Sequence, residues 1–490
     1  MSKYICYKNP VIRGFYPDPS ICRVDKDYYL VTSSFEYLPG VPLFHSHNLI
    51  DWQQIGHCIQ KEHNIDLTNT PCSGGIFAPT IRYHKGVFYM ITTNISQGNF
   101  VMKSNDIIKG FGDPTWIDIK GIDPSLYFED DKVYVQYASF EESGNCIKQT
   151  EIDIETGELL KEPVIISYGC GGRDVEAPHI YFINGWYYLM CAEGGTREGH
   201  MVSIQRSQNI YGPYETSPYH PVVSNKDYSK QKLQSVGHAD LIEDHEGHWW
   251  IVALATRPYK HRHLLGRETI LLPIEWKAGW PIVTSQYAKE EIECIGISPA
   301  QQSTESFHDN FQSSQLSLHY NTIRDFITDN YKIENNSLIL YGNGEYLDTS
   351  YTPIFIGVRQ KEYRCHFETK INASINNNSR AGLSILMDKD HHMEIGISNH
   401  QLYVKKKVAD IETINTYKDN INDLIIGIEA DQQFYYFYYI DNNEKFIIDK
   451  TYIKHLCTET VFSAFTGVYC GMFIEGLGEA QFYYFDYQEA

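Results

Sequence analysis

The sequence predicts an all-β protein in which a five-bladed β-propeller is followed by a β-sandwich. One short motif occurs five times, at intervals of roughly 45 to 60 residues. An aromatic, alternating segment bounded by polar turns follows each copy, as expected for short strands. We place the propeller at residues 1–297, a linker at 298–314 and the sandwich at 315–490.

The recurring motif places a small or acidic residue before a proline, and only its fifth copy lacks the proline. The copies span residues 16–21, 77–81, 122–126, 176–180 and 238–242. In a propeller the first strand of each blade lines a central channel. We therefore expect five side chains at the start of these strands to converge on the axis, namely Asp18, Phe77, Asp123, Glu176 and His238.

The segments after each motif supply the other strands of the blade. Second strands are predicted at 27–31, 87–91, 132–136, 186–190 and 248–252. A third recurring piece marks the next strand in three of the blades, at 44–49, 102–107 and 205–210. No segment shows a sustained apolar period of 3.6 residues, so a helical repeat is not expected.

A second domain is predicted where this pattern stops. Residues 298–314 are rich in Pro, Gln, Ser, Thr and Asn, which is typical of a linker. Further strands are predicted at 362–368, 381–386, 392–397 and 434–439. Many short alternating strands with Asn and Gly turns indicate a β-sandwich.

The composition narrows the class of ligand. The 490-residue chain has 41 Lys and Arg against 62 Asp and Glu, a net charge of −21. Nucleic acids and anionic membranes are bound through clustered cations, so we expect neither as a partner and expect a small neutral substrate. Residues 1–9 lack the apolar core of a signal peptide, and no run reaches the roughly 20 apolar residues that cross a bilayer. We expect a cytoplasmic protein, and an acidic chain with a second domain could form a homo-oligomer.

Motifs for cofactors are weak or absent in the sequence. Eleven cysteines without a Cys-x-x-Cys pair fit reduced thiols better than a disulfide framework or a structural zinc site. There is no phosphate-binding Gly-x-x-x-x-Gly-Lys-Ser/Thr loop, no dinucleotide fingerprint and no Gly-x-Ser-x-Gly elbow. His245 and His248 have the wrong spacing for a helical zinc pair. We therefore expect no organic cofactor.

Three of the five converging residues carry carboxylates: Asp18, Asp123 and Glu176. Each of them alone is better explained as a turn or solvated loop residue, because Asx-Pro turns are common. Three like charges that face one axis repel each other, however, and need a chemical reason to be kept. Hydrolysis of a glycosidic bond is such a reason, since it requires a carboxylic acid at the leaving oxygen and a carboxylate on the other side of the sugar. When carboxylates are crowded together but have different surroundings, their pKa values are also pushed apart. One group can then act as the acid and another as the base.

Four further residues are ambiguous. His238 is either a core histidine or a ligand for a hydrated metal ion on the axis. Phe35 and Phe77 are either core residues or aromatic faces on which a sugar ring stacks. Arg267, which we place on an inner strand of the last blade, is either an ion-pair partner or a donor to sugar hydroxyls.

At these residues the sequence resembles glycoside hydrolase family 43, in particular its β-xylosidases and α-L-arabinofuranosidases. The resemblance lies in residues 9–10, 14–23, 34–41, 75–79, 122–126, 175–179 and 266–269. It extends over nearly the whole chain, including a C-terminal sandwich that helps to close the active site. It implies an exo-acting inverting enzyme that releases terminal D-xylose from β-1,4-xylo-oligosaccharides, with terminal α-L-arabinofuranose as a second substrate. An arabinofuranosidase with little xylosidase activity is the alternative.

The resemblance also implies roles for the site residues. Asp18 is the general base that activates water, and Glu176 is the general acid. Asp123 raises the pKa of the acid and fixes its orientation. Arg267 grips the hydroxyls of the terminal sugar, and Phe465 reaches from the sandwich to wall off the pocket. An inverting mechanism predicts that the two catalytic carboxyl groups lie about 6.5–9.5 Å apart.

Two positions bear on the substrate and on a metal. Phe77 stands where the better-known xylosidases of the family have tryptophan, so the preference between xylose and arabinose stays open. Both are pentoses of similar size, and a pocket discriminates poorly between close analogues. The resemblance places His238 near a calcium ion on the axis. A propeller that binds sugar without cleaving it is the alternative from a different class, and the three intact carboxylates argue against it.

Overall fold

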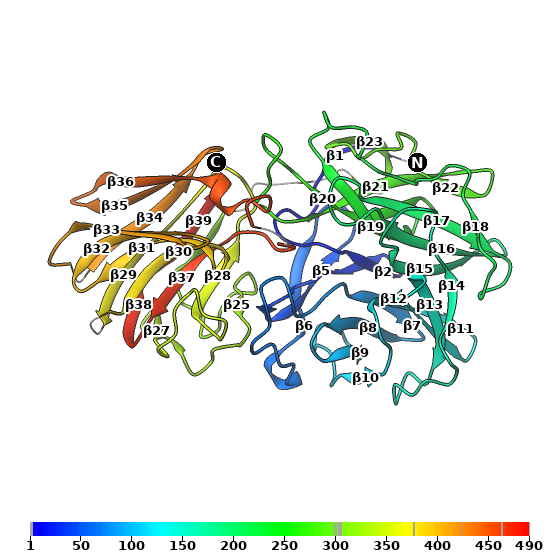
Figure 1. Cartoon of the computed structure of the whole chain (residues 1–490), viewed down its shortest axis with the longest axis horizontal. Coiled ribbons are helices and arrows are strands. Elements are labelled where there is room, and N and C mark those ends of the chain that lie inside the picture. The colour runs from blue at the N-terminus through cyan, green and yellow to red at the C-terminus, as the bar shows by residue number, and fades with distance from the viewer. Residues whose placement is uncertain are drawn as a thin grey trace.

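The structure is a computed structural model that describes residues 3–296, 298, 301, 306–375, 378–421, 423–461 and 464–489. Two β-domains lie side by side, coloured blue to green and yellow to red in Figure 1. The predicted all-β class, a five-bladed propeller followed by a sandwich, is confirmed. The helices of the described chain are two short 3₁₀ turns, η1 (Lys61–His63) and η2 (Ile453–Leu456). Among the described residues, no helix is long and apolar enough to span a bilayer.

Five four-stranded antiparallel sheets form the blades of the propeller. Blade I consists of β2 (Ser20–Val24), β3 (Asp27–Val31), β5 (Gly40–Ser46) and β6 (Gln53–Ile59). Blade II consists of β7 (Thr80–His84), β8 (Val87–Asn94), β9 (Gly98–Ser104) and β10 (Thr115–Ile117). Blade III consists of β11 (Ile122–Glu129), β12 (Lys132–Glu141), β13 (Gly144–Ile152) and β14 (Val164–Ser167). Blade IV consists of β15 (Glu176–Ile183), β16 (Trp186–Glu193), β17 (Met201–Ser207) and β18 (Glu215–Thr216). Blade V consists of β19 (Gln234–Glu243), β20 (Trp249–Thr256), β21 (Glu268–Lys277) and β22 (Trp280–Ile282).

The first strands of the blades form a closed ring around the axis. Neighbours in this ring are β2 and β7, β7 and β11, β11 and β15, β15 and β19, and β19 and β2. The segment before β2 runs along blade V, where Val11 and Ile12 hydrogen-bond to Thr269. Nearer the N-terminus, β1 (Lys3–Lys8) pairs antiparallel with β23 (Glu291–Gly296). The N-terminal segment therefore joins the first blade to the last.

One guanidinium group ties four blades together on the axis. Arg82 of blade II donates to both carboxylate oxygens of Asp240 in blade V, at 2.7 and 3.2 Å. Arg82 also donates to Ser20 Oγ in blade I at 3.2 Å and to His179 Nδ1 in blade IV at 2.9 Å. Burial raises the pKa of Asp240, but the Arg82 guanidinium more than offsets this, so the pKa lies below its usual value. The axis thus holds a buried, fully ionised pair.

The second domain consists of two antiparallel sheets around one core. The larger sheet follows the order β26 (Tyr331–Glu334), β27 (Ser337–Tyr341), β38 (Gly478–Phe482), β29 (Cys365–Ile375), β34 (Asp423–Ala430), β35 (Phe434–Asp441) and β36 (Glu444–Tyr452). On this sheet, β39 (Phe485–Glu489) pairs with β29 and with β24 (Phe307–Asp309). The smaller sheet follows the order β28 (Ile354–Arg359), β37 (Tyr469–Glu475), β30 (Arg380–Asp388), β31 (His391–Ser398), β32 (Gln401–Val408) and β33 (Ile411–Lys418).

The predicted linker, residues 298–314, extends too far toward the C-terminus. Strand β24 falls inside this range and pairs with β39, with Phe307 opposite Tyr487. Its residue His308 lies 3.3 Å from Asp486, which is 178 residues later in the chain. A three-residue strand whose partner lies at the other end of the domain has no local signal, so the polar composition concealed it.

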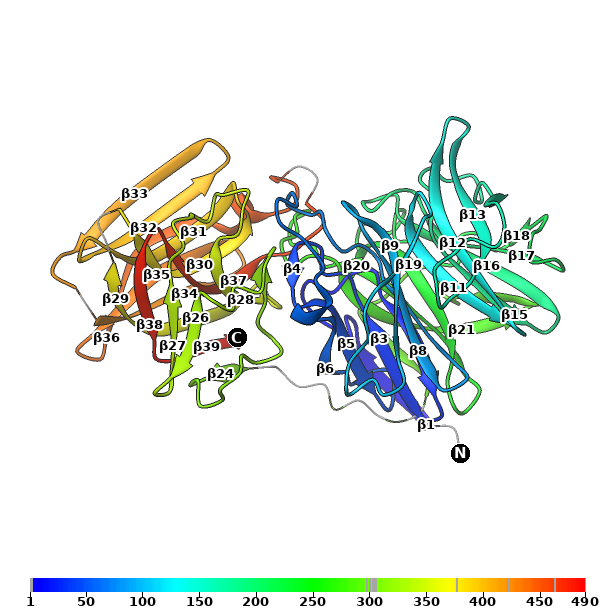
Figure 2. The same cartoon turned by 90° about the horizontal axis from the view of Figure 1, so that it is seen from below.

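Backbone pairing and aromatic packing join the two domains. Strand β25 (Thr322–Ile323) pairs antiparallel with β4 (Tyr37–Leu38), which lies between the domains in Figure 2. The buried Arg359 guanidinium of the sandwich donates to the Phe15 carbonyl of the propeller at 2.7 Å. An aromatic cluster crosses the same seam and contains Phe15, Phe35, Tyr37, Phe355, Tyr469 and Phe473.

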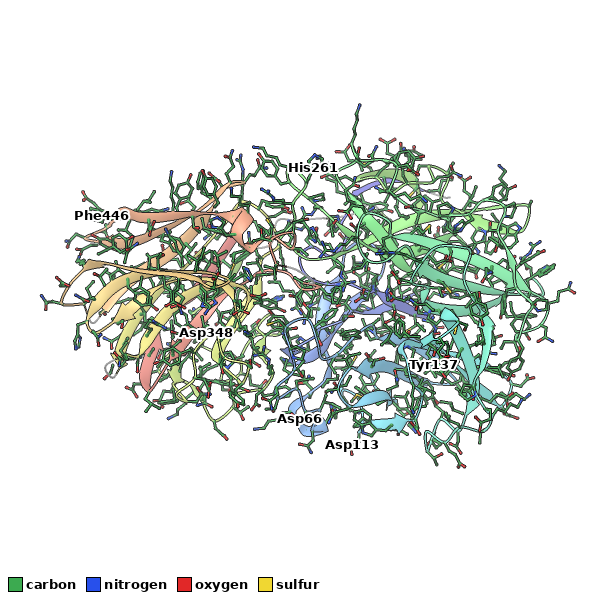
Figure 3. All side chains as sticks on the ribbon, viewed as in Figure 1. Asp66, Asp113, Tyr137, His261, Asp348 and Phe446 are labelled. Atoms are coloured by element: carbon green, nitrogen blue, oxygen red, sulfur yellow. The ribbon has the colours of Figure 1, made fainter. Side chains whose placement is uncertain are left out.

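A loop of blade V also crosses this seam, at the upper edge of Figure 3, where His261 is labelled. Its neighbour His263 places Nδ1 2.9 Å from Glu459 Oε1 of the sandwich. The Thr458 N–H donates to the carbonyl of His263 at 2.9 Å. The segment of the second domain that leads to Phe465 is therefore anchored on the propeller.

The cysteines form no disulfide: all eleven are unpaired. Burial raises the pKa of several of these thiols, as for Cys22, Cys58 and Cys191, which makes them unreactive core residues. Reduced thiols were expected from the sequence. The cytoplasmic location and the oligomeric state stay predictions.

Candidate active site

Three inner strands begin at the predicted carboxylates. Asp18 lies two residues before β2, Asp123 is the second residue of β11 and Glu176 is the first residue of β15. Asp18 and Asp123 have φ angles of 56° and 54°, and a bulge follows both Ile122 and Glu176. Bulges re-aim side chains, and strained φ values of this kind concentrate at functional sites. The backbone therefore departs from regular strand geometry at the residues expected to react.

Asp18 is a buried carboxylate held by an arginine. Arg267 Nη1 lies 2.8 Å from Asp18 Oδ1 and Nη2 lies 3.2 Å from Oδ2, a bidentate pair. Ser33 Oγ donates to Oδ2 at 2.6 Å, and His238 Nδ1 lies 3.5 Å from Oδ1. Burial raises the pKa of Asp18, but Arg267, His238 and the Ser33 hydroxyl together outweigh burial and bring the pKa below 3.8. Asp18 is therefore ionised at neutral pH.

The other two carboxyl groups have the opposite character. Burial, reinforced by the charges of Asp174 and Asp18, raises the pKa of Glu176 to about 7. Burial and the neighbouring Glu176 and Asp18 also raise the pKa of Asp123 well above 3.8. Asp123 accepts a hydrogen bond from the backbone N–H of Ala177, the residue after Glu176. Asp123 and Glu176 thus form a pair that retains a proton near neutral pH.

Arg267 does not lie on an inner strand, contrary to the prediction. It precedes β21, the third strand of blade V, and its side chain extends to Asp18. Arg267 Nη1 also lies 3.3 Å from Thr196 Oγ1, and Nε lies 3.4 Å from the Phe465 carbonyl. Its guanidinium carbon is 5.6 Å from the ring centroids of both Phe35 and Phe465. Arg267 therefore reaches the axis with a long side chain from a loop. An alignment of the inner strands alone could not predict this.

Three phenylalanines form one wall of the site. The ring centroids of Phe35 and Phe77 are 5.2 Å apart, and those of Phe35 and Phe465 are 6.1 Å apart. Phe35 is buried, whereas Phe77 and Phe465 are partly exposed. Phe465 comes from the sandwich domain, and its backbone N–H donates to Ser73 Oγ of the propeller at 2.9 Å. Residues of both domains therefore surround the carboxylates.

His238 lies beside Asp18, but the residues around it do not suit a calcium ion. Calcium binds about six to eight oxygen ligands. Of the carboxylates near His238, Asp18 is engaged by Arg267 and Asp240 is engaged by Arg82. Within the described residues His238 belongs to no cluster of three metal-ligating side chains. The calcium ion stays a prediction.

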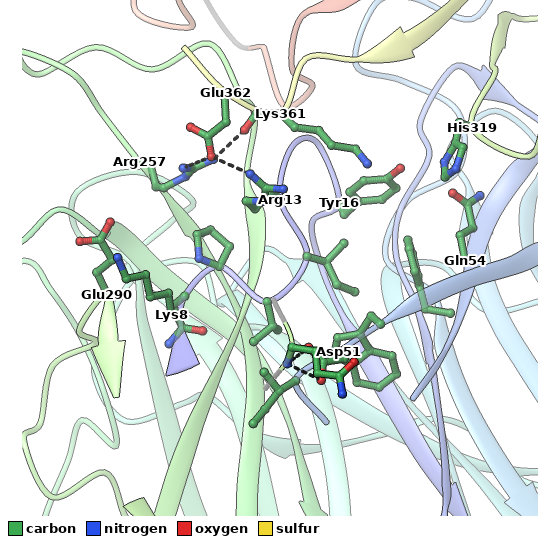
Figure 4. Close-up of a pocket in the computed structure, with 18 residues that line it drawn as sticks. Lys8, Arg13, Tyr16, Asp51, Gln54, Arg257, Glu290, His319, Lys361 and Glu362 are labelled. Carbon is green, nitrogen blue, oxygen red and sulfur yellow. Dashed lines mark hydrogen bonds and ion pairs between the residues drawn. The ribbon is translucent and has the colours of Figure 1, made fainter. Parts of the chain in front are cut away.

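A groove at the domain seam lacks this chemistry (Figure 4). It has a volume of about 440 Å³, and none of the three carboxylates lines it. One of its carboxylates is paired with two arginines, since Glu362 Oε1 lies 3.1 Å from Arg13 Nη1 and 2.8 Å from Arg257 Nη1. The groove therefore lacks the carboxyl group of lowered pKa and the carboxyl pair of raised pKa that are found on the axis.

Three small polar residues that complete the site were missed from the sequence: Ser33, Ser73 and Thr196. They contact Asp18, the backbone of Phe465 and Arg267, respectively. Ser and Thr are common in turns, and nothing in the local pattern marks Ser33 or Ser73. Only the two glycines before Thr196, with φ angles of 90° and 71°, indicate a tight loop there.

The site combines an ionised carboxylate with a carboxyl pair that keeps a proton. Hydrolysis of a glycosidic bond requires these two states together. The arginine fork holds Asp18 in its ionised form, and the aromatic wall suits the apolar face of a sugar ring. The fold and the site together define a glycosidase.

Comparison with known families leads to the same class. Residues 7–281 match Glycosyl hydrolases family 43. Residues 308–488 match the Beta xylosidase C-terminal Concanavalin A-like domain. The chain belongs to glycosyl hydrolase family 43.

Several relatives align over almost the entire chain. A non-reducing end α-L-arabinofuranosidase from Bacteroides ovatus is 36% identical over 492 residues, which cover 97% of this chain and 92% of the relative. A xylosidase/arabinosidase from Butyrivibrio fibrisolvens is 33% identical over 98% of both chains. The crystal structure of xylan beta-1,4-xylosidase from Bacillus halodurans C-125 has a TM-score of 0.93 at 28% identity, covering 99% of this chain and 100% of that one.

Proposed function

We propose that this glycosidase is exo-acting and inverting, releases terminal D-xylose from short β-1,4-xylo-oligosaccharides and also accepts terminal α-L-arabinofuranose. One observation carries the reaction type: the pKa of Asp18 is lowered while that of Glu176 is raised to about 7. The names of the relatives support the substrate class, since they include a xylosidase/arabinosidase and a xylan beta-1,4-xylosidase.

In this proposal Asp18 is the general base. Its ionised carboxylate takes a proton from the water whose oxygen attacks the anomeric carbon. Arg267 keeps Asp18 ionised and has one N–H of Nη2 left for a hydroxyl of the terminal sugar. Because one displacement with water inverts the anomeric carbon, space for this water is needed, and the two catalytic carboxyls are expected about 6.5–9.5 Å apart.

Glu176 is the general acid. It donates its proton to the glycosidic oxygen as the bond breaks, so the leaving sugar departs as a neutral alcohol. Asp123 belongs to the same buried carboxyl pair, and burial together with the charges of Glu176 and Asp18 raises its own pKa, so the pair as a whole keeps its proton. Asp123 also hydrogen-bonds the backbone next to Glu176 and so fixes the orientation of the acid.

The enclosure of the site supports cleavage at chain ends. Asp18 and Asp123 are only 4% and 8% exposed. The partly exposed groups, Glu176, Phe77 and Phe465, mark the entrance. A terminal residue can enter a pocket with one opening, whereas an internal residue needs an opening on two sides.

An arabinofuranosidase with little xylosidase activity is the second candidate. The relative with 36% identity is named a non-reducing end α-L-arabinofuranosidase. Phe77 packs against Phe35 at the wall on which the sugar would stack. An apolar wall separates such similar pentoses by only about 1–3 kcal/mol. We therefore expect Phe77 to adjust the preference between the two sugars without abolishing either activity.

Initial rates on aryl β-D-xylopyranoside and aryl α-L-arabinofuranoside test the proposal. We expect the wild type to release sugar from both substrates, faster from the xyloside. In Asp18→Asn the base is missing, so the rate should fall by about 10²- to 10⁴-fold. Proton NMR of xylobiose hydrolysis should show α-xylose as the first product. Release mainly from the arabinoside would select the second candidate. No release from either would favour a sugar-binding propeller, and β-xylose as first product would exclude inversion.

The pH profile of kcat/KM should be bell-shaped, with its alkaline limb near pH 7. Activity requires ionised Asp18, so it is lost only as pH falls through the lowered pKa of this carboxyl, below the ordinary range of an aspartate. It also requires protonated Glu176, so it declines as pH rises through about 7. Replacing Asp174 with Asn removes a negative charge that holds the proton on Glu176. The alkaline limb should therefore move to lower pH in Asp174→Asn and stay in place in the exposed control Asp113→Asn. Movement to higher pH would contradict the assignment.

A further inference from the structure

Three metal-ligating side chains meet at one end of blade I, away from the carboxylates on the axis. Asp27 is the first residue of β3, His45 lies near the end of β5, and His47 follows β5. Asp27 Oδ1 is 2.8 Å from His45 Nε2 and 2.9 Å from His47 Nδ1. All three donor atoms lie within 4.8 Å of one another.

The strand register brings these residues together. In the β3–β5 ladder Tyr29 is opposite His45. Asp27 is two residues from Tyr29 and His47 is two residues from His45, so all of these side chains lie on one face of the blade. The His45 ring also packs on Tyr29, with centroids 5.2 Å apart.

The backbone around His47 is fixed before any ligand binds. Ser46 Oγ accepts hydrogen bonds from the N–H groups of Asn48 at 3.1 Å and Leu49 at 3.0 Å. Asn48 Nδ2 in turn donates to Asp51 at 2.8 Å. His47 therefore projects from a tight turn, so little conformational entropy remains to be lost on binding.

The donor set suits a borderline transition-metal ion. Two imidazole nitrogens and a carboxylate oxygen are ligands that Zn²⁺ binds at about 2.0–2.2 Å, with water in a fourth position. Tetrahedral ligands at this bond length lie about 3.3 Å from each other, so Asp27 Oδ1 needs to move away from each imidazole nitrogen by only about half an ångström. The side chain of His47 is 77% exposed, which leaves the site open to metal from solution.

A second cluster of this type, buried in the sandwich, does not suit a metal. His392, Glu394 and Glu475 also have their donor atoms within 4.8 Å of each other. There, Lys405 Nζ lies 3.0 Å from Glu394 Oε1 and Arg380 Nε lies 2.6 Å from Glu475 Oε2. These cations already neutralise both carboxylates. No cation is paired with Asp27 other than the two histidines among the ion pairs of the described residues.

We propose that Asp27, His45 and His47 bind one divalent transition-metal ion such as Zn²⁺. Asp18 lies before β2 and Asp27 lies after it, so the length of this strand places the cluster roughly 20 Å from Asp18. The metal joins the start of β3 to the end of β5. It therefore stabilises blade I and takes no part in hydrolysis.

Calorimetric titration of the full-length, tag-free protein with Zn²⁺, after treatment with EDTA and dialysis, tests the site. We expect one equivalent to bind with a dissociation constant in the micromolar range and to raise Tm. His47→Ala should weaken this binding at least about tenfold, the loss caused even by outer-shell partners of a metal. Because His47 is exposed, the variant should fold normally.

Two further variants separate metal binding from hydrogen bonding alone. Asp27→Asn keeps an acceptor oxygen for both imidazoles but loses the charge, so it should bind zinc more weakly while its Tm without metal changes little. The control His248→Ala removes a histidine from an Asp–His pair that has no second histidine, where Nδ1 lies 3.1 Å from Asp244, and should bind zinc like the wild type. No saturable binding by the wild type, or equal binding by His47→Ala, would overturn the proposal.

Discussion

Replacement of Glu176 by glutamine is expected to lower kcat on xylobiose by about 10²- to 10⁴-fold. The amide preserves the size and shape of the carboxyl group but has no acidic proton for the leaving oxygen. Burial and the charges of Asp174 and Asp18 keep this proton on Glu176 up to about pH 7, and an amide cannot replace it. The measurement is xylose release from xylobiose at pH 6, where the wild-type acid is protonated.

The dependence on the leaving group makes this prediction specific. Nitrophenol departs without protonation far more readily than a sugar alcohol, so Glu176→Gln should lose much less activity on nitrophenyl β-D-xyloside than on xylobiose. The exposed control Glu162→Gln should behave as the wild type on both substrates. Equal losses on the two substrates would contradict proton donation by Glu176, and near-normal turnover of xylobiose would remove it from the acid role.

Replacement of Arg82 by methionine is expected to lower the free energy of unfolding by about 3–5 kcal/mol, as for other broken buried ion pairs. Methionine fills much of the space but leaves Asp240 buried, charged and without its bidentate partner. Ser20 and Tyr181 would still donate to Asp240, each at 2.6 Å, but neither carries a positive charge. Urea unfolding followed by tryptophan fluorescence measures the effect.

The location of the ion pair decides the size of this effect. The control Lys103→Met removes a lysine whose Glu155 partner is 68% exposed, and it should cost less than about 1 kcal/mol. In the double variant Arg82→Met/Asp240→Asn the uncompensated charge is gone, so part of the lost stability should return. If Arg82→Met unfolds like the control, the guanidinium does not hold the ring of blades together.

The repeated motif made most of the propeller and the three carboxylates predictable. Each copy combines a turn signal with an alternating strand, and radial repetition then implies that Asp18, Asp123 and Glu176 face one axis. The prediction was wrong about Arg267, because a loop residue with a long side chain can reach the axis from outside the inner strands. The predicted linker wrongly included β24, because the strand that pairs with β24, β39, lies at the far end of the chain.

Local sequence patterns could not predict the contacts between the domains. Phe465 was predicted only from the family resemblance, and the hydroxyl of Ser73 that accepts a hydrogen bond from its backbone N–H lies 392 residues earlier in the chain. Arg82 carried no signal either, since an arginine in a strand is usually solvated, and its partners come from three other blades. These contacts depend on how distant segments dock, which no window of sequence describes.

The seam between the domains has an evolutionary consequence. Strands β4 and β25 share a backbone ladder, and the loop that carries Phe465 docks on the propeller through Ser73. A recombination event that exchanged the second domain would have to supply the same strand and the same loop, or the aromatic seam would be exposed to water. The two domains are therefore expected to be inherited as one unit, unlike binding modules that hang on a flexible tether and are shuffled freely among enzymes.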